Sequence, residues 1–131
     1  MKRALLAALV LAVIVPVQAQ EPEFFQGIFC DTPEQIEQVV KLGAELGDAR
    51  AGIDAVNVKA KEAKPSAPAA CIYTHILGVR GKQVKVIDSP TGQLGVVPFL
   101  VWRVVLLPFG MVSAADGTVW FTLAEPKGDG A

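Results

Sequence analysis

The chain has 131 residues, of which 52% are apolar, and its formal net charge at neutral pH is −1. This length is enough for one domain with a small hydrophobic core and leaves little room for a separate substrate-binding lobe. Outside residues 1–19 the net charge is −3, because that segment carries two of the 12 basic residues and no acidic residue. A mildly acidic chain without a clustered basic face excludes nucleic acid as a partner.

The first 19 residues have the pattern of a signal peptide. Lys2 and Arg3 precede an apolar run over 4–15, and Val17 and Ala19 stand at the −3 and −1 positions of a cleavage site. A positive start, an apolar core of about a dozen residues and small residues before the cut are the features that signal peptidase reads. We therefore expect cleavage after residue 19 and export of the remainder, which is then periplasmic or secreted.

Two cysteines, Cys30 and Cys71, lie in the part that would be exported. In an oxidising compartment such a pair most often forms a disulfide, and we predict one between these two residues. The alternative is a redox-active pair. It is disfavoured because the two cysteines are not in Cys-x-x-Cys spacing.

A polar, flexible leader is expected over 20–26, followed by a short strand over 27–30 and then by a clear helix start. Thr32 and Gln35 fit a capping box, in which each side chain bonds the backbone N–H of the other residue. Pro33 suits the first helical position. The pattern predicts a helix that begins directly after Thr32.

The first helix is expected to end at Gly47, because apolar residues recur at helical spacing up to that point. Asp48 can cap a second helix, whose apolar period continues to Ala60. The two prolines of the segment 65–68 exclude a regular helix there, so we expect a solvated linker.

From Ala70 onward the pattern changes to β-branched and aromatic residues with alternating polarity, which is typical of strands. The predicted strands cover 71–77, 83–87, 94–112 and 118–124. The predicted fold is α+β, with two N-terminal helices packed on one face of an antiparallel sheet of about four to five strands, and one disulfide. A single domain is expected over 27–125, followed by a flexible tail over 126–131.

The segment 94–112 is strongly apolar, and Arg103 is its only charge. A membrane span would fit its length, but β-branched residues, two prolines and the central arginine favour a strand. Both faces of such a strand are apolar, whereas two helices cover only one face of a small sheet. Either the sheet curls over itself, with Arg103 at the rim beside a carboxylate, or another molecule covers the second face. In the second case Phe99, Trp102 and Arg103 are the predicted interface with a protein partner or a second copy.

Residue types that catalysis needs are scarce and scattered. His75 is the only histidine, and the three serines stand in turns or linkers rather than in a nucleophile elbow. Asp31, Glu34 and Glu37 fit helix capping and a solvated helix face better than acid–base work. With both cysteines in a disulfide, too few ligands remain for zinc. We therefore predict a protein that is not an enzyme, with no catalytic, cofactor-binding or metal-binding residue.

The segments 29–32 (Phe-Cys-Asp-Thr) and 55–57 (Ala-Val-Asn), with Cys71 ahead of a β-rich half, resemble a group of small exported bacterial proteins of unassigned function. The resemblance covers most of the chain after the signal peptide and departs from the group in the longer, basic stretch over 59–69. It implies the fold and the exported location, and it assigns no site residues.

The sequence thus predicts a small exported protein of the cell envelope, which works as a non-enzymatic interaction module through an apolar sheet face. One alternative is a small periplasmic inhibitor or ligand-binding module, in which the loop 89–92 or the segment 59–64 plugs a target. Another is a membrane-associated protein with 94–112 as the span.

Overall fold

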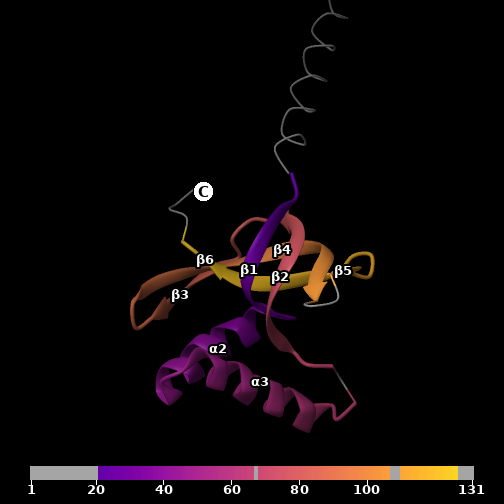
Figure 1. The fold of residues 1–131 in the computed structure, drawn as a ribbon. Coiled ribbons are helices and arrows are strands. Elements are labelled where there is room, and N and C mark those ends of the chain that lie inside the picture. The colour runs from indigo at the N-terminus through magenta and orange to yellow at the C-terminus, as the bar shows by residue number, and fades with distance from the viewer. Residues whose placement is uncertain (1–20, 67, 107–109, 127–131) are drawn as a thin grey trace, which may run out of the picture.

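The computed structural model describes residues 21–66, 68–106 and 110–126 of the chain. Within them a strand, two helices and five further strands follow one another (Figure 1). The elements are β1 (Glu23–Cys30), α2 (Pro33–Leu46), α3 (Ala49–Ala63), β2 (Cys71–Arg80), β3 (Lys85–Ser89), β4 (Gly92–Leu106), β5 (Gly110–Ser113) and β6 (Val119–Ala124). Both helices pack against the antiparallel sheet, which confirms the predicted α+β fold.

The N-terminal strand is longer than predicted. It begins at Glu23 rather than at Gly27, so four of the seven residues of the expected leader over 20–26 are strand. All eight residues of β1 pair with β2 in one continuous antiparallel register, and this long-range pairing extends the strand into part of the segment that was expected to be a flexible leader. The predicted signal peptide over 1–19 lies outside the described residues, as does nearly all of the predicted tail over 126–131.

The apolar segment 94–112 also has other boundaries than predicted. Its described parts belong to two strands, because β4 ends at Leu106 and residues 110–113 run back beside it as β5. Among the described residues, no helix is long and apolar enough to cross a membrane.

The sheet curls until it closes on itself. Its strand order is β2–β1–β6–β4–β3, and β4 pairs in addition with β2 and β5. Because β4 has 15 residues, successive parts of it can pair with β3, β6, β2 and β5. The ring of β1, β2, β4 and β6 is completed by the pair of Cys30 and Phe121. Within the monomer, the curled sheet therefore accounts for a strand that is apolar on both faces.

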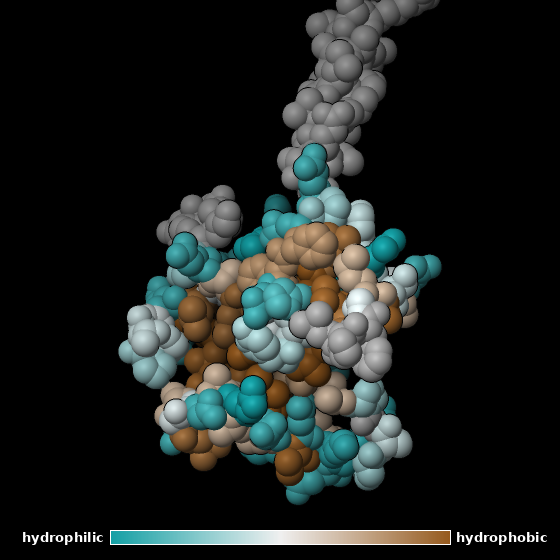
Figure 2. Space-filling model, in the orientation of Figure 1, coloured by the Kyte–Doolittle hydropathy of each residue, from teal (hydrophilic) through white to brown (hydrophobic). Residues whose placement is uncertain are grey.

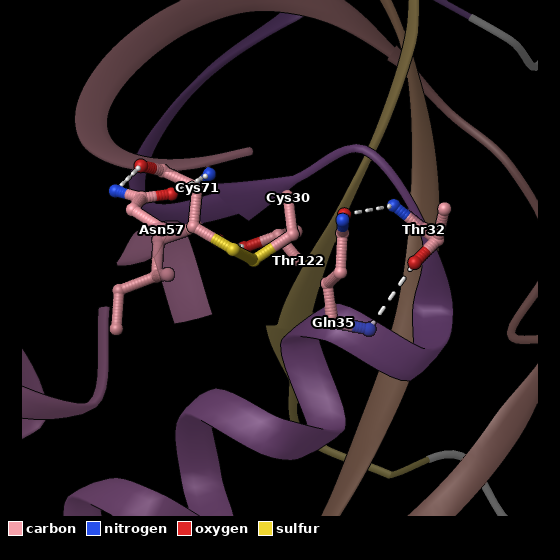
Figure 3. Close-up of a disulfide and its surroundings, with 7 residues drawn as sticks. Cys30, Thr32, Gln35, Asn57, Cys71 and Thr122 are labelled. Carbon is pink, nitrogen blue, oxygen red and sulfur yellow. Dashed lines mark hydrogen bonds between the residues drawn. A yellow bond between two sulfur atoms is a disulfide. The ribbon is translucent and has the colours of Figure 1, made fainter. Parts of the chain in front are cut away.

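The start of α2 confirms the predicted capping box (Figure 3). The backbone N–H of Gln35 donates to Thr32 Oγ1 at 3.2 Å, and the N–H of Thr32 donates to Gln35 Oε1 at 3.1 Å. At the other end Gly47 has φ 78°, a left-handed conformation that favours glycine. The carboxylate of Asp48 caps α3 by accepting the N–H of Arg50 at 3.1 Å. Local sequence signals thus set the start and the end of α2 and the start of α3.

Two hydrophobic clusters lie on the two faces of the curled sheet. The cluster between helices and sheet contains Cys30, Ile36, Val39, Val56, Ala70, Cys71, Ile87 and Val96. The cluster inside the curled sheet contains Phe29, Ile76, Val97, Phe99, Val101 and Val104. Neighbouring residues of β4 alternate between the clusters, with Val96 toward the helices and Val97 toward the interior, because side chains alternate along a strand.

Candidate functional site

The three residues of the predicted interface, Phe99, Trp102 and Arg103, separate in the structure. Phe99 is 0% exposed and belongs to the interior of the curled sheet. The centroid of its ring lies 5.1 Å from that of Phe25 and 6.1 Å from that of Phe29. The prediction for Phe99 is therefore wrong: strand alternation points its side chain into the core, where no partner can reach it.

Arg80 covers the aromatic interior beside Phe99. Its guanidinium carbon lies 5.4 Å from the ring centroids of both Phe25 and Phe99. Its Nη2 and Nε donate to Glu23 Oε1 at 2.9 and 3.0 Å. The aromatic faces attract the cation, and the carboxylate keeps it paired. We assign this arginine a structural role at the edge of the interior.

Trp102 and Arg103 lie together on the outer surface because β4 has a bulge at this point. Gly78 pairs with Val101, but the preceding Leu77 pairs with Arg103, so Trp102 is an extra residue in β4. Strict alternation would place Trp102 and Arg103 on opposite faces. With the bulge both residues are exposed, and Trp102 has 46% of its surface open to solvent.

Further apolar side chains surround the bulge. Leu100 and Val119 face each other across β4 and β6, and both are exposed. A hollow of about 360 Å³ lies between Trp102, Arg103 and the loop 113–117. The exposed residues Leu100, Trp102, Arg103 and Val119 are named the Trp102 surface below.

Arg103 has no carboxylate partner in the described part of the chain, where the ion pairs are Arg80 with Glu23 and Lys85 with Glu37. The expectation that a carboxylate at the rim pairs with Arg103 is thus not met there. Asp116 lines the same hollow but forms no ion pair with Arg103, so the guanidinium can still take a carboxylate partner beside the exposed indole of Trp102.

The predicted disulfide between Cys30 and Cys71 is present and joins the paired strands β1 and β2. Each cysteine is only 1% exposed, beneath the helices. The side-chain amide of Asn57 in α3 bonds both backbone groups of Cys71: it accepts the N–H at 2.8 Å and donates to the carbonyl at 2.9 Å (Figure 3). Because solvent thiols cannot reach buried sulfurs, this geometry is that of a structural bond and disfavours the redox alternative.

Sequence reasoning missed two polar residues that hold this region. Asn57 stood only as part of a short motif, and nothing in the helix pattern distinguished it from a solvated side chain. Thr122 is 1% exposed, and its hydroxyl donates to the carbonyl of Ile28 at 2.6 Å. The only signal for Thr122 is a hydroxyl within an otherwise apolar strand.

His75 lies on β2 and borders a hollow of about 430 Å³. The other lining residues are Gln26, Tyr73, Thr74, Val105 and Leu106. No carboxylate occurs among these described lining residues, and the Tyr73 hydroxyl accepts a hydrogen bond from the Gln26 amide at 2.9 Å. The hollow therefore offers the imidazole no orienting acid. Among the described residues, no group of three or more His, Cys, Asp or Glu could hold a metal ion.

The acidic residues near the start of α2 have separate surroundings. Glu34 lies in the first helical turn, and Glu37 forms an ion pair with Lys85 of β3. Asp31 is exposed as a residue, but partial desolvation of its carboxyl raises its pKa above the usual 3.8. Between 3.8 and the raised value the folded chain binds more protons, so the free energy of unfolding falls slightly as the pH rises through that window.

Among the described residues, the candidate site is the Trp102 surface around the β-bulge, and the buried disulfide is a separate, structural feature. In comparisons with protein-family models, curated proteins and solved structures, no match to this chain was found.

Proposed function

We propose that this chain is an exported protein of the cell envelope, periplasmic or secreted, which acts by binding another protein through the Trp102 surface and performs no catalysis. The observation that carries the proposal is a bulge that holds a tryptophan and an arginine side by side in solvent. Tryptophan and arginine are the residues most often found as anchors of protein interfaces. The signal-peptide pattern of residues 1–19 and the disulfide support the exported location.

The composition of the Trp102 surface indicates the chemistry of the partner. Leu100, Trp102 and Val119 supply apolar contact area, and Arg103 supplies a charge that has no ion-pair partner among the described residues. A complementary protein surface would present apolar side chains around one carboxylate, which a guanidinium can bind through two parallel hydrogen bonds. The hollow beside Trp102 gives room for one inserted side chain.

The direct test is site-specific crosslinking in cells that produce the full-length chain. A photoreactive phenylalanine derivative replaces Trp102, and a matched control carries it at Val58, an exposed position on α3. We expect a discrete heavier adduct from position 102 and none from position 58. Equal adducts from both positions, or none from either, would contradict the proposal.

A second measurement separates a partner protein from a second copy. Light scattering of the purified protein at high micromolar concentration is expected to show a monomer, because the proposed partner is a different protein. With the crosslinked partner purified, Trp102→Ala should weaken binding about 30-fold, the effect of losing one strong interface anchor. Val58→Ala should leave binding unchanged. A dimer that Trp102→Ala dissociates would assign the surface to self-association instead.

A further inference from the structure

A separate apolar cavity, open to solvent on one side, lies in the helix layer of the molecule, between helix α2 and the turn that joins β3 to β4. Its volume is about 230 Å³, and Val39 and Val40 of α2 face Leu94 and Leu123 of the sheet across it. Figure 2 shows hydrophobic surface in this region, between strand β3 and the helices. Apart from two hydroxyl residues in the turn, Ser89 and Thr91, the side chains that line the cavity are apolar.

The cavity exists because the helix corner above it carries small residues. Gly43, Ala44 and Ala49 line it where α2 ends and α3 begins, and a larger side chain at Ala44 or Ala49 would occupy part of the space. Its size limits what can enter. A cavity of about 150 Å³ accommodates benzene, and pockets for drug-sized ligands start at about 300 Å³. A single ring or a short alkyl chain is therefore the apolar group that fits.

The cavity opens into a wider, charged mouth of about 460 Å³, with which it shares Val40, Ala44 and the turn residues. Glu37, Lys41, Glu45 and Asp88 line the mouth. Glu37 already pairs with Lys85, whereas neither Glu45 nor Asp88 has an ion pair among the described residues. With Glu37 neutralised by Lys85, Glu45 and Asp88 remain against Lys41, which leaves an excess of one negative charge at the mouth.

The end of α2 adds to this negative potential. The last turn of the helix contains Glu45 and no basic residue, so no side chain there offsets the partial negative charge of the helix C-terminus. A cation in the mouth would gain from both the carboxylates and the helix dipole. An anion of the same size would be repelled by both.

From this combination we infer that the cavity is a binding site for a small amphipathic amine, which buries one ring-sized apolar group beneath α2 and holds its ammonium group in the mouth near Glu45 and Asp88. The site is distinct from the Trp102 surface, and its occupant is a small molecule rather than a protein. The amine's apolar group would contact Val40 and Leu94.

Three probes that share a phenyl ring and a short polar chain test the charge preference: 2-phenylethylamine, 2-phenylethanol and phenylacetate. In calorimetric or NMR titrations of the purified protein, the amine should bind with a dissociation constant of about 1 mM or lower, which suits a ligand of so few atoms. The alcohol should bind more weakly and phenylacetate most weakly. Equal binding of all three, or no binding of the amine, would overturn the inference.

Variants then locate the site. Ala44→Met should fill the cavity and abolish binding of the amine and the alcohol, whereas Ala63→Met, at the exposed end of α3, should change neither. Asp88→Asn should weaken the amine about two- to fivefold, as for a partly exposed ion pair, and leave the alcohol unaffected. Amine binding that survives Ala44→Met would overturn the site.

A peptide probe distinguishes a protein occupant from a small molecule. A Phe-Lys peptide that binds more than 100-fold more tightly than 2-phenylethylamine would assign the cavity to a protein partner and overturn the small-molecule inference. The outcome is independent of the Trp102 surface, because Trp102→Ala is expected to leave amine binding unchanged. Loss of amine binding in Trp102→Ala, in a variant that remains folded, would place the site elsewhere.

Discussion

The side chain of Asn57 makes the backbone hydrogen bonds that a neighbouring strand would otherwise make with one residue of β2. The described pairs of β2 with β4 run from His75 to Arg80, so Cys71 has a strand partner only in β1. The side-chain amide of Asn57 hydrogen-bonds both the backbone N–H and the backbone carbonyl of Cys71, and thereby ties α3 to the start of β2. A buried N–H or carbonyl without a partner would cost free energy, because neither could reach water.

We predict that Asn57→Ala lowers the free energy of unfolding by about 2 kcal/mol, since it leaves two backbone groups of the buried Cys71 unsatisfied. Asn57→Asp is the matched variant. Its carboxylate still accepts the Cys71 N–H, but its second oxygen faces the Cys71 carbonyl oxygen, and because two acceptors repel each other, Asn57→Asp should not restore the lost stability. Urea unfolding followed by circular dichroism measures both. A loss below about 0.5 kcal/mol for Asn57→Ala would show that water replaces the side chain.

At the scale of elements, the two helices approach each other through glycines. A Cβ atom on Gly52 of α3 would lie 2.5 Å from the carbonyl oxygen of Val39 and 2.8 Å from the backbone nitrogen of Gly43. Both distances are shorter than any van der Waals contact, so the backbone of α2 occupies the space that a side chain would need. The close approach lets Val39 and Val56 reach the same cluster below the helices.

The sign of the stability change caused by one substitution, Gly52→Ala, tests this close approach. In an ordinary helix interior, replacing glycine by alanine stabilises by roughly 0.5 to 1 kcal/mol. Here Gly52→Ala should instead destabilise by about 1 to 3 kcal/mol, because the added methyl group forces the helices apart. Thermal or urea unfolding of the single variant decides. A stabilised variant would mean that the helices separate without cost and that the contact carries no energy.

The elements also show where sequence patterns succeed and where they fail. The start of α2 was predictable because Thr32, Pro33 and Gln35 act within a single turn. The bulge at Trp102 was not, because it depends on the opposite strand: a Cβ on Gly78 would overlap the carbonyl oxygen of Leu100, so only glycine permits this approach. Strict alternation along β4 would place Phe99 and Arg103 on the same face, whereas the bulge moves Arg103 to the outside.

At the scale of the whole molecule, closure of the sheet decides which apolar residues remain on the surface. The sequence predicted a strand apolar on both faces, and this was correct for Val96 and Val97. The sequence could not distinguish a sheet that curls over itself from a sheet whose second face is covered by another molecule. The strand pairs that close the curled sheet join residues far apart in the chain, such as Cys30 with Phe121. Closure buries Phe99 and leaves Trp102 outside, so the predicted interface is reduced to part of its original extent.

The disulfide lies where the two layers meet, and its removal tests how strongly they depend on each other. It joins two residues with a sequence separation of 41, and the loop that it closes contains both helices. In the chain-entropy model such a loop stabilises the folded state by about 4 kcal/mol, because the bond restricts the unfolded chain. The double variant Cys30→Ala, Cys71→Ala should lose about that amount, together with a smaller contribution from the missing sulfur atoms in the cluster.

The measurement is urea unfolding of the variant beside the reduced and the oxidised native protein. The reduced native protein keeps the sulfur atoms, so it isolates the effect of the cross-link. If reduction changed the free energy of unfolding by less than about 1 kcal/mol, pairing of β1 with β2 and the Asn57 contact would hold the layers together without the bond.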